Sequence, residues 1–330
     1  MLPLGVFQRM IGALKEIGVT GEFTEFTVEV NPEDIAEKGA AYVERLLELG
    51  VNRVSMGVQS FDDGILKWMN RRHDSATAVR AYCILEDVGV KNISIDLIFG
   101  LSQLSEDLWR ETLNKALSIS SRGVPPQHIS SYQLSVEPGS MLAKLVERSK
   151  WSEASDEFCQ RQYDMLCDIL AAAGYHHYEI SNFAQPGHEA VHNSAYWKHI
   201  PYIGLGPGAH SFVGPASRRS IPASSPYSEN YKRKWNEGNL NEYLKAGESG
   251  DFTAVSGGET LDEEQLMMEK VMLALRTSAG LQESSLRQCC DPRALDRALV
   301  AGDLIRLPDG AIRIPESRFF VSDNIVSSII

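Results

Sequence analysis

ISIDLIFG, residues 93–100, is the stretch that decides the fold. It predicts a strand that Gly100 closes, and similar strands are predicted at 26–30, 53–58 and 129–134. Helices are expected between these strands, over about 33–50, 76–87 and 105–118. This alternation predicts an α/β fold of parallel strands with right-handed crossovers, as in a (β/α) barrel or an open doubly wound sheet.

Polar residues stand at or near the ends of these predicted strands. They are Glu29, Asn31, Gln59, Ser60 and Asp96. In both architectures the chemistry lies at the carboxyl ends of parallel strands, because the loops that follow them meet at one edge of the sheet. The sequence therefore predicts a functional site at that edge.

The pattern changes in the second half of the chain. A polar, aromatic stretch at 175–212 contains six of the eight histidines, and residues 213–258, rich in Ser, Pro and Gly, are expected to be loops and a linker around one short helix. Residues 259–330 predict three helices, a hairpin with an Asp-Gly turn and a final helix. We expect a core at 1–212 and a small winged-helix-like α+β module at 259–330.

Composition limits the classes of function. The 330 residues carry a formal net charge of −12, which disfavours binding to a phosphate backbone, so no nucleic-acid partner is expected. The N-terminus is an amphipathic helix pattern rather than a signal peptide, and there is no long apolar run, which predicts a cytoplasmic protein. The five cysteines match no zinc or cluster spacing and are expected to be thiols.

Eight motifs together resemble, in order and spacing, the HemN/HemW branch of the radical S-adenosylmethionine (SAM) proteins. They are VEVNPED (28–34), RVSMGVQSFDD (53–63), MNRRH (69–73), IDLIFGL (95–101), SSYQLSVEPGSML (130–142), YEISNFA (178–184), HNSAYW (192–197) and YIGLGPGAHSF (202–212). The resemblance covers nearly the whole chain. It implies a radical SAM (β/α) barrel, with SAM and a [4Fe–4S] cluster as the cofactors of the family.

The resemblance also implies which residues contact SAM: Glu29, Gln59, Arg71 and Asp96. Their chemistry suits this ligand, since carboxylates accept from ammonium and hydroxyl donors and an arginine can bind a carboxylate with two parallel bonds. The alternative is structural: strand-end carboxylates can cap the backbone, and an arginine can form a surface ion pair. Neighbouring Arg72 fits that surface role better.

HNSAYW matches the HNxxYW motif of the HemW side of the branch, which implies heme contacts by His192, Tyr196 and Trp197. An imidazole is a good axial ligand for heme iron, so His192 is the expected ligand, and the aromatic rings offer flat apolar faces. The alternative is a hydrogen-bonded structural histidine. His199 and His210 are weaker candidates for the ligand.

The family begins with a strand, a CxxxCxxC loop and a GGGTP segment, and none of these occurs in this sequence. Three thiolates are needed to hold the cluster, so we expect this chain to assemble no [4Fe–4S] cluster and to present an incomplete barrel. A truncated product, a misassigned start codon and a genuine loss of the chemistry are the three explanations.

The resemblance implies a heme chaperone that passes heme to acceptor proteins, with membrane association only through a partner. The alternative is the oxygen-independent coproporphyrinogen III oxidase of heme biosynthesis, whose barrel is alike. A (β/α) hydrolase is disfavoured, because the sequence has no nucleophile elbow and no metal-ligand cluster. A dinucleotide site at GLGPGA (204–209) is rejected, because no helix follows it.

Overall fold

The computed structural model describes residues 3–19, 21–214 and 231–330, and the chain divides into two compact units, Met1–Val191 and His192–Ile330. The first unit contains the strands predicted for the core. Residues 192–212, which we expected to extend that core, belong to the second unit.

The first unit is built on a mixed sheet with strand order β1-β2-β3-β4-β6-β5. Neighbouring strands from β1 to β4 are parallel, whereas β6 pairs antiparallel with both β4 and β5. The α/β fold and its parallel strands are therefore as predicted, and a hairpin within the polar stretch is added. The strands are β1 (Thr27–Val30), β2 (Arg53–Gln59), β3 (Ile93–Phe99), β4 (His128–Gln133), β5 (His176–Glu179) and β6 (Asn182–Ala184).

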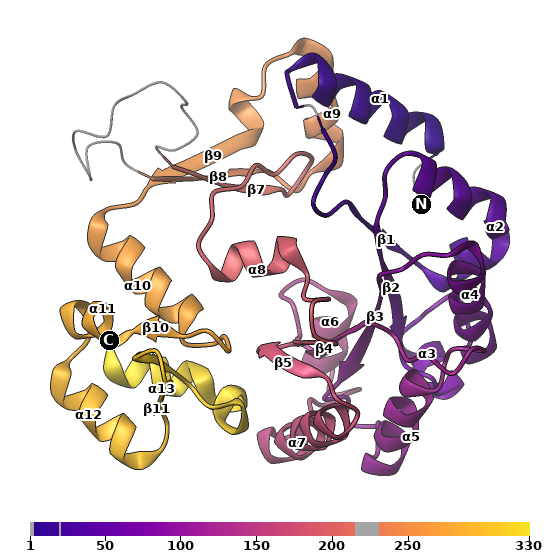
Figure 1. The fold of residues 1–330 in the computed structure, drawn as a ribbon. Coiled ribbons are helices and arrows are strands. Elements are labelled where there is room, and N and C mark those ends of the chain that lie inside the picture. Colours follow the sequence, from indigo (N-terminus) through magenta and orange to yellow (C-terminus); the bar gives the residue numbers. More distant parts are fainter. Residues whose placement is uncertain (1–2, 20, 215–230) are drawn as a thin grey trace. The chain divides into compact units, whose positions relative to one another are not determined.

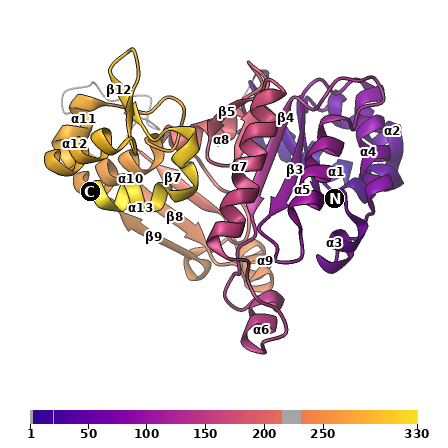
Figure 2. The same ribbon diagram turned by 90° about the horizontal axis from the view of Figure 1, so that it is seen from below.

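Helices precede and connect these strands, and several of them cover one face of the sheet. They are α1 (Leu4–Glu16), α2 (Pro32–Glu48), α3 (Asp63–Trp68), α4 (Ser75–Val88), α5 (Glu106–Leu117), α6 (Met141–Glu147) and α7 (Asp156–Ala172). Figures 1 and 2 show α2, α4 and α5 together on one side of the strands. Side-chain hydrogen bonds at the helix N-termini, such as those of Asp74, Ser105 and Ser155, fix where α4, α5 and α7 begin.

The two faces of the sheet differ in chemistry because successive side chains of a strand alternate between them. On β3, Ile93, Ile95, Leu97 and Phe99 are at most 2% exposed and form the apolar core under the helices. The alternate positions include Ser94 and Asp96, and Asp96 lies in register with Gly57 of β2 and Ser130 of β4. The second face is therefore polar along its length.

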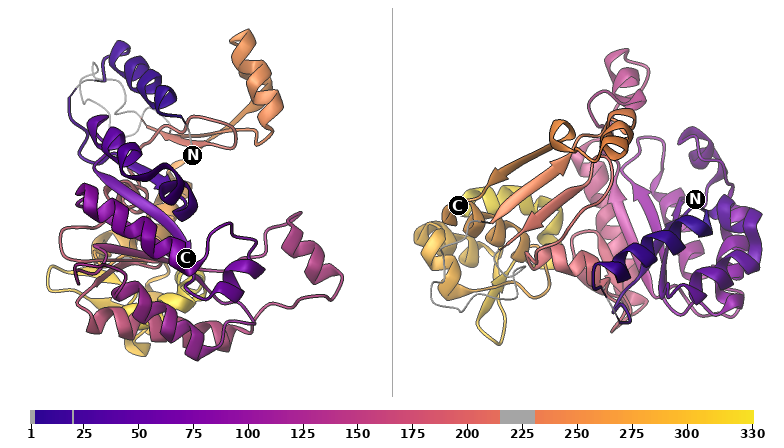
Figure 3. Two further views of the ribbon diagram at one scale, coloured as in Figure 1. Left: turned by 90° about the vertical axis from the view of Figure 1, so that its right-hand side faces the viewer. Right: turned by 90° about the horizontal axis from the view of Figure 1, so that it is seen from above.

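The second unit contains two small antiparallel sheets, which Figure 3 shows apart from each other. The first is formed by β7 (His210–Val213), β8 (Lys232–Asn236) and β9 (Ser256–Thr260), and α9 (Leu240–Ser249) lies between β8 and β9 in sequence. The loops and linker expected at 213–258 are thus partly strand. KRKWN and SGGET lack alternating apolar residues, so their pairing depends on the backbone rather than on a buried face.

The C-terminal part has the predicted α+β content. Its helices pack with a three-stranded sheet of order β10-β12-β11 around fully buried Leu286, Leu295 and Ile312. None of the helices in the described residues is long and apolar enough to cross a membrane. The elements are α10 (Glu263–Ala274), β10 (Leu281–Gln282), α11 (Glu283–Cys289), α12 (Pro292–Ala301), β11 (Ile305–Arg306), β12 (Ala311–Arg313) and α13 (Ser322–Ile329).

Candidate functional site

Gly57 near the end of β2 makes room for three polar side chains. A Cβ atom at this position would lie 2.8 Å from Gln59 Nε2, 3.4 Å from Arg71 Nη2 and 3.8 Å from Asn31 Oδ1. A side chain here would therefore displace at least the amide of Gln59. The convergence of Gln59, Arg71 and Asn31 depends on the missing Cβ.

Gln59 ends β2 in an unusual conformation. Its φ is 69°, in the left-handed region that costs a non-glycine residue free energy, and the register between β2 and β3 shifts between Gly57 and Gln59. The bulge ends the regular ladder and leaves the amide of Gln59 against Gly57. Strain of this kind is common at functional sites, where the surrounding structure maintains it.

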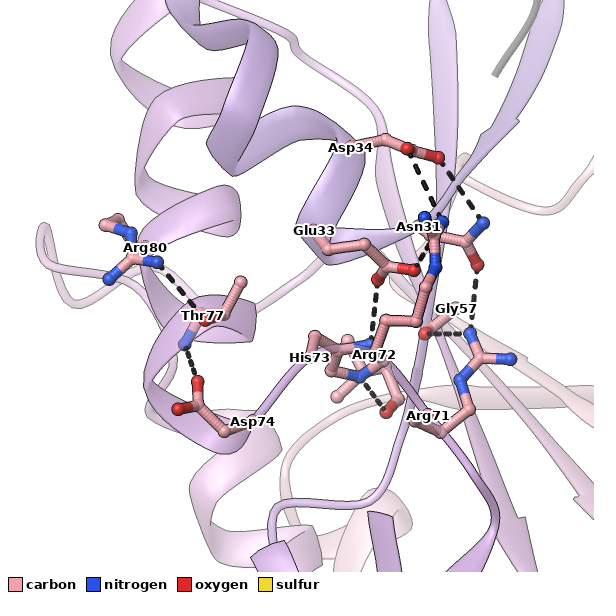
Figure 4. Close-up of polar contacts among 11 residues, drawn as sticks. Asn31, Glu33, Asp34, Gly57, Arg71, Arg72, His73, Asp74, Thr77 and Arg80 are labelled. Atoms are coloured by element: carbon pink, nitrogen blue, oxygen red, sulfur yellow. Dashed lines mark hydrogen bonds and ion pairs between the residues drawn. The ribbon is translucent and has the colours of Figure 1, made fainter. Parts of the chain in front are cut away.

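Arg71 reaches the same place from the loop after α3. Its Nη2 donates to Asn31 Oδ1 at 2.9 Å and to the carbonyl oxygen of Gly57 at 3.2 Å, as Figure 4 shows. Both of these bonds use one nitrogen of a half-buried guanidinium. Nε and Nη1 are left to donate to a ligand; because their N–H groups do not lie side by side, each of them would bind a ligand oxygen singly.

Asp96 is the acid of this face. It accepts a hydrogen bond from Ser55 Oγ at 3.0 Å. Burial raises the pKa of Asp96 to about 6; hydrogen bonds from Ser55 and Ser130 oppose this rise, and the charge of Glu29 adds to it. The carboxyl group therefore changes its charge close to neutral pH, where it can either accept or share a proton.

Glu29 is exposed on β1, in register with Ser55 of β2. Its charge acts on Asp96, so the two carboxylates share one face of the sheet. The structure thus brings Gln59 and Arg71 together around Gly57, places Asp96 beside them in register, and leaves Glu29 at the more open end. The role of each toward SAM remains a prediction.

The polar face continues across β4 and the hairpin with buried groups. His128 is fully buried between Ser94 Oγ and Tyr178 Oη, at 2.8 Å from each, and burial lowers its pKa. Glu179, 1% exposed, accepts from the backbone N–H of Ser181 and from Asn182 Nδ2, and burial raises its pKa to about 7. The bond of His128 to Tyr178 ties the hairpin to β4, whereas the bonds of Glu179 lie within the hairpin.

The SAM contacts implied by the resemblance did not include Gly57 or Asn31, although Asn31 was among the polar residues at the strand ends and both lie in the quoted motifs. The contact between Asn31 and Arg71 joins residues that are 40 positions apart. Only the folded structure shows that the missing Cβ of Gly57 leaves room for Arg71 and that the side-chain amide of Asn31 accepts a hydrogen bond from it. The polar residues at strand ends were the signal that pointed to this edge.

The candidate heme residues lie on α8 (Val191–Trp197), which starts where the first unit ends. His192 and Tyr196 are exposed and adjacent on the helix, with His192 Nε2 and Tyr196 Oη 2.8 Å apart and their rings edge to face. Tyr196 also meets the ring of Tyr202 edge to face. Trp197, five residues after His192, lies on a different side of the helix by its spacing.

The two weaker candidates differ from His192. His199 stacks on Phe212, and its Nε2 lies 3.0 Å from Glu269 Oε2. Burial lowers the pKa of His199, and the hydrogen bond that Glu269 accepts from it opposes that shift. His210 is exposed at the start of β7, with its ring near Trp235. Glu269 therefore competes with any ligand role of His199.

The described residues contain no set of side chains that could bind a metal cluster. No three His, Cys, Asp or Glu side chains gather there in a way that could hold a metal ion. The five cysteines are free thiols, and the closest described pair, Cys289 and Cys290, has its sulfur atoms 4.0 Å apart within one helix end. These residues do not fit a [4Fe–4S] cluster, which requires three converging thiolates.

Residues 3–116 match the Radical SAM superfamily. The chain is 32% identical to the heme chaperone HemW of Bacillus subtilis over 80% of its length, and 31% identical to the HemW of Synechocystis over 87%. It spans 63% and 64% of these two relatives.

A solved structure shares the fold. The coproporphyrinogen III oxidase HemN of Escherichia coli, a radical SAM enzyme, superposes with a TM-score of 0.76 over 99% of this chain and 74% of that one. The identity is 19%, so this likeness supports the architecture alone.

Proposed function

We propose that this chain belongs to the HemW branch of the radical SAM superfamily and is a heme chaperone, which binds heme and delivers it to acceptor proteins. The observation that carries the proposal is the likeness to HemW proteins across 80–87% of the chain, which includes the HNSAYW segment. The alternative, coproporphyrinogen oxidation, is supported by a shared fold only.

The heme site of this proposal is centred on His192. The side chain is exposed on α8, the ring of Tyr196 lies against it edge to face, and the ring of Tyr202 lies against that of Tyr196. Ile203 and Leu205, 76% and 77% exposed, follow within the same unit and offer the apolar surface that a porphyrin requires. On this proposal, His192 donates a nitrogen lone pair to the heme iron.

The SAM site of this proposal is the polar face around Gly57. The free donors of Arg71 would bind the SAM carboxylate, the amide of Gln59 would lie beside them, and Asp96 and Glu29 would accept from ammonium or hydroxyl groups. When bound, SAM would supply a sulfonium centre. The residues of this chain would orient the ligand, with Asp96 accepting from it as a carboxylate, and we propose no step that uses a cluster.

The partners of this proposal are heme and proteins that take up heme. On this proposal the chain works in the cytoplasm, and it meets a membrane only through such a partner.

A hemin titration tests the heme site. We expect the wild type to shift the Soret band of hemin, and His192→Ala to bind about tenfold more weakly, since one coordination bond is lost. His176→Ala is the matched control, because His176 is also exposed but lies on β5 of the first unit. Equal spectra and affinities for the wild type and His192→Ala would remove His192 from the site.

A further inference from the structure

His73 is a buried histidine that lies two residues after Arg71. Its side chain is 0% exposed, with Nε2 3.0 Å from the carbonyl oxygen of Val58 and Nδ1 3.0 Å from Glu33 Oε2. Figure 4 shows the ring beside Glu33. The histidine therefore joins the loop after α3 to both β2 and the first turn of α2.

The chemistry of the two partners fixes where protons lie. A carbonyl oxygen can only accept, so Nε2 must carry a proton. A second proton then lies between Nδ1 and Glu33 Oε2, because two lone pairs would repel each other. Arg72, whose Nη2 is 2.9 Å from Glu33 Oε1 and 3.6 Å from Asp34 Oδ1, favours the carboxylate charge. Both bonds of His73 are thus strong and directional.

The contacts of Arg71 and His73 repeat one pattern. Arg71 holds the carbonyl oxygen of Gly57 and the side chain of Asn31, while His73 holds the next carbonyl on β2 and the side chain of Glu33. Each residue therefore bridges β2 and the start of α2. The bonds of Arg71 are part-buried and open to competition by water, as is the bond of His73 to Glu33, whereas the bond of His73 to Val58 is buried.

We propose that His73 is a positioning residue for Arg71. By anchoring the loop two residues further on, it holds the guanidinium at Gly57 with Nε and Nη1 free, so that Arg71 meets the carboxylate of a ligand without first being ordered. Lost side-chain freedom is a main cost of binding, and an ordered arginine avoids it. This inference rests on the proposed role of Arg71 in SAM binding.

The test uses the full chain, two ligands and four proteins. The ligands are SAM and 5′-methylthioadenosine, which lacks the amino-acid part that Arg71 would bind. The proteins are the wild type, His73→Ala, His73→Gln and the control Arg72→Gln, which removes a neighbouring, 67% exposed cation but leaves both bonds of His73. Glutamine keeps a donor for Val58 but presents its oxygen to Glu33, so the anchor is weakened without a cavity.

Affinities are measured by calorimetry, and the exposure of Arg71 is measured by its rate of modification with phenylglyoxal, read by mass spectrometry. We expect both His73 variants to bind SAM about tenfold more weakly, to bind methylthioadenosine within about twofold of the wild type, and to modify several-fold faster at Arg71. Arg72→Gln keeps both bonds of His73 and removes only a charge beside Glu33, so it should lie much closer to the wild type than either His73 variant in all three measurements. Circular dichroism melts show that each variant is folded.

Three results would overturn the proposal. The first is a folded His73 variant that keeps the wild-type SAM affinity and Arg71 reactivity. The second is an equal loss of affinity for both ligands, which would indicate a general structural role. Failure of both variants to fold would make His73 a folding residue. If the wild type binds no SAM, the proposed SAM site fails, and the Arg71 modification rate alone still decides whether His73 holds the arginine.

Discussion

The polar face of the sheet and the α8 helix hold their candidate groups in different ways. On the sheet, Arg71 and Asp96 are fixed by bonds to residues 40 and 41 positions away, and a glycine shapes the space between strands. On α8, the bond described for His192 joins it to Tyr196 within one exposed helical turn. The first arrangement is preorganised by the fold, whereas the second can rearrange locally around a large ligand.

The largest expected effect tests how much the buried carboxyl group of Glu179 changes the stability of the sheet. At pH 8.5 the free energy of unfolding of Glu179→Gln should exceed that of the wild type by about 3 kcal/mol. Burial raises the pKa of Glu179 from 4.5 to about 7, so the wild type holds a buried charge at this pH, whereas glutamine is neutral. The folded-state pKa is raised, so the wild type loses this stability as pH rises through about 7.

Urea unfolding at pH 5 and pH 8.5 measures this difference, which should shrink at pH 5, where the wild-type carboxyl is protonated. Glu248→Gln on the exposed surface of α9 is the control and should change little at either pH. A Glu179→Gln protein as unstable as the wild type at pH 8.5 would show that the hydrogen bonds to Ser181 and Asn182 outweigh the cost of burial.

Gly57→Ala should displace polar side chains on the same face of the sheet. Its Cβ would displace Gln59 Nε2, so SAM binding should weaken by about 2 kcal/mol, or roughly thirtyfold, as charge-assisted bonds lose their geometry. Gly12→Ala on α1 adds a Cβ in open space and is the matched control. Calorimetry that finds equal SAM affinity for the wild type and Gly57→Ala would separate this glycine from the site.

Asp96 should make SAM binding depend on pH. Its pKa of about 6 means that the accepting carboxylate is formed as pH rises, so affinity should increase about tenfold between pH 5 and pH 7.5. Asp96→Asn should bind weakly with a flat profile, and Asp107→Asn, on exposed α5 surface, should keep the wild-type slope. A flat wild-type profile would contradict the role of Asp96 as acceptor.

Tyr196→Phe gives the smallest expected effect and tests α8. If the hydroxyl of Tyr196 donates to His192 Nε2, it occupies the lone pair that iron needs, so its removal should strengthen hemin binding about threefold. Tyr202→Phe is the control, since Tyr202 meets Tyr196 through its ring. Weaker hemin binding by Tyr196→Phe would mean that the hydroxyl orients His192 for the iron instead.

The same contrast explains what could be predicted from the sequence. The core strands were predictable because runs such as 93–99 combine buried positions with glycine stops, and the motifs gave Gln59, Arg71 and Asp96 directly. The strands β8 and β9 were missed, since a charged run and two glycines carry no apolar period. Gly57 and His73 were not predicted as site residues, because their contacts with Arg71, Glu33 and Val58 join segments that come together only in the folded chain.

Buried His128, which bonds to Tyr178, should make the sheet less stable at low pH, just as Glu179 makes it less stable at high pH. Burial lowers the pKa of His128, so the unfolded chain takes up a proton more readily, and stability is lost as pH falls below about 6.5. Glu179 acts in the opposite direction as pH rises through about 7. The sheet around the β5–β6 hairpin should therefore be most stable on the acid side of neutrality, between about pH 4.5 and 6.5, and amide hydrogen exchange in β5 and β6 should accelerate on either side of this range.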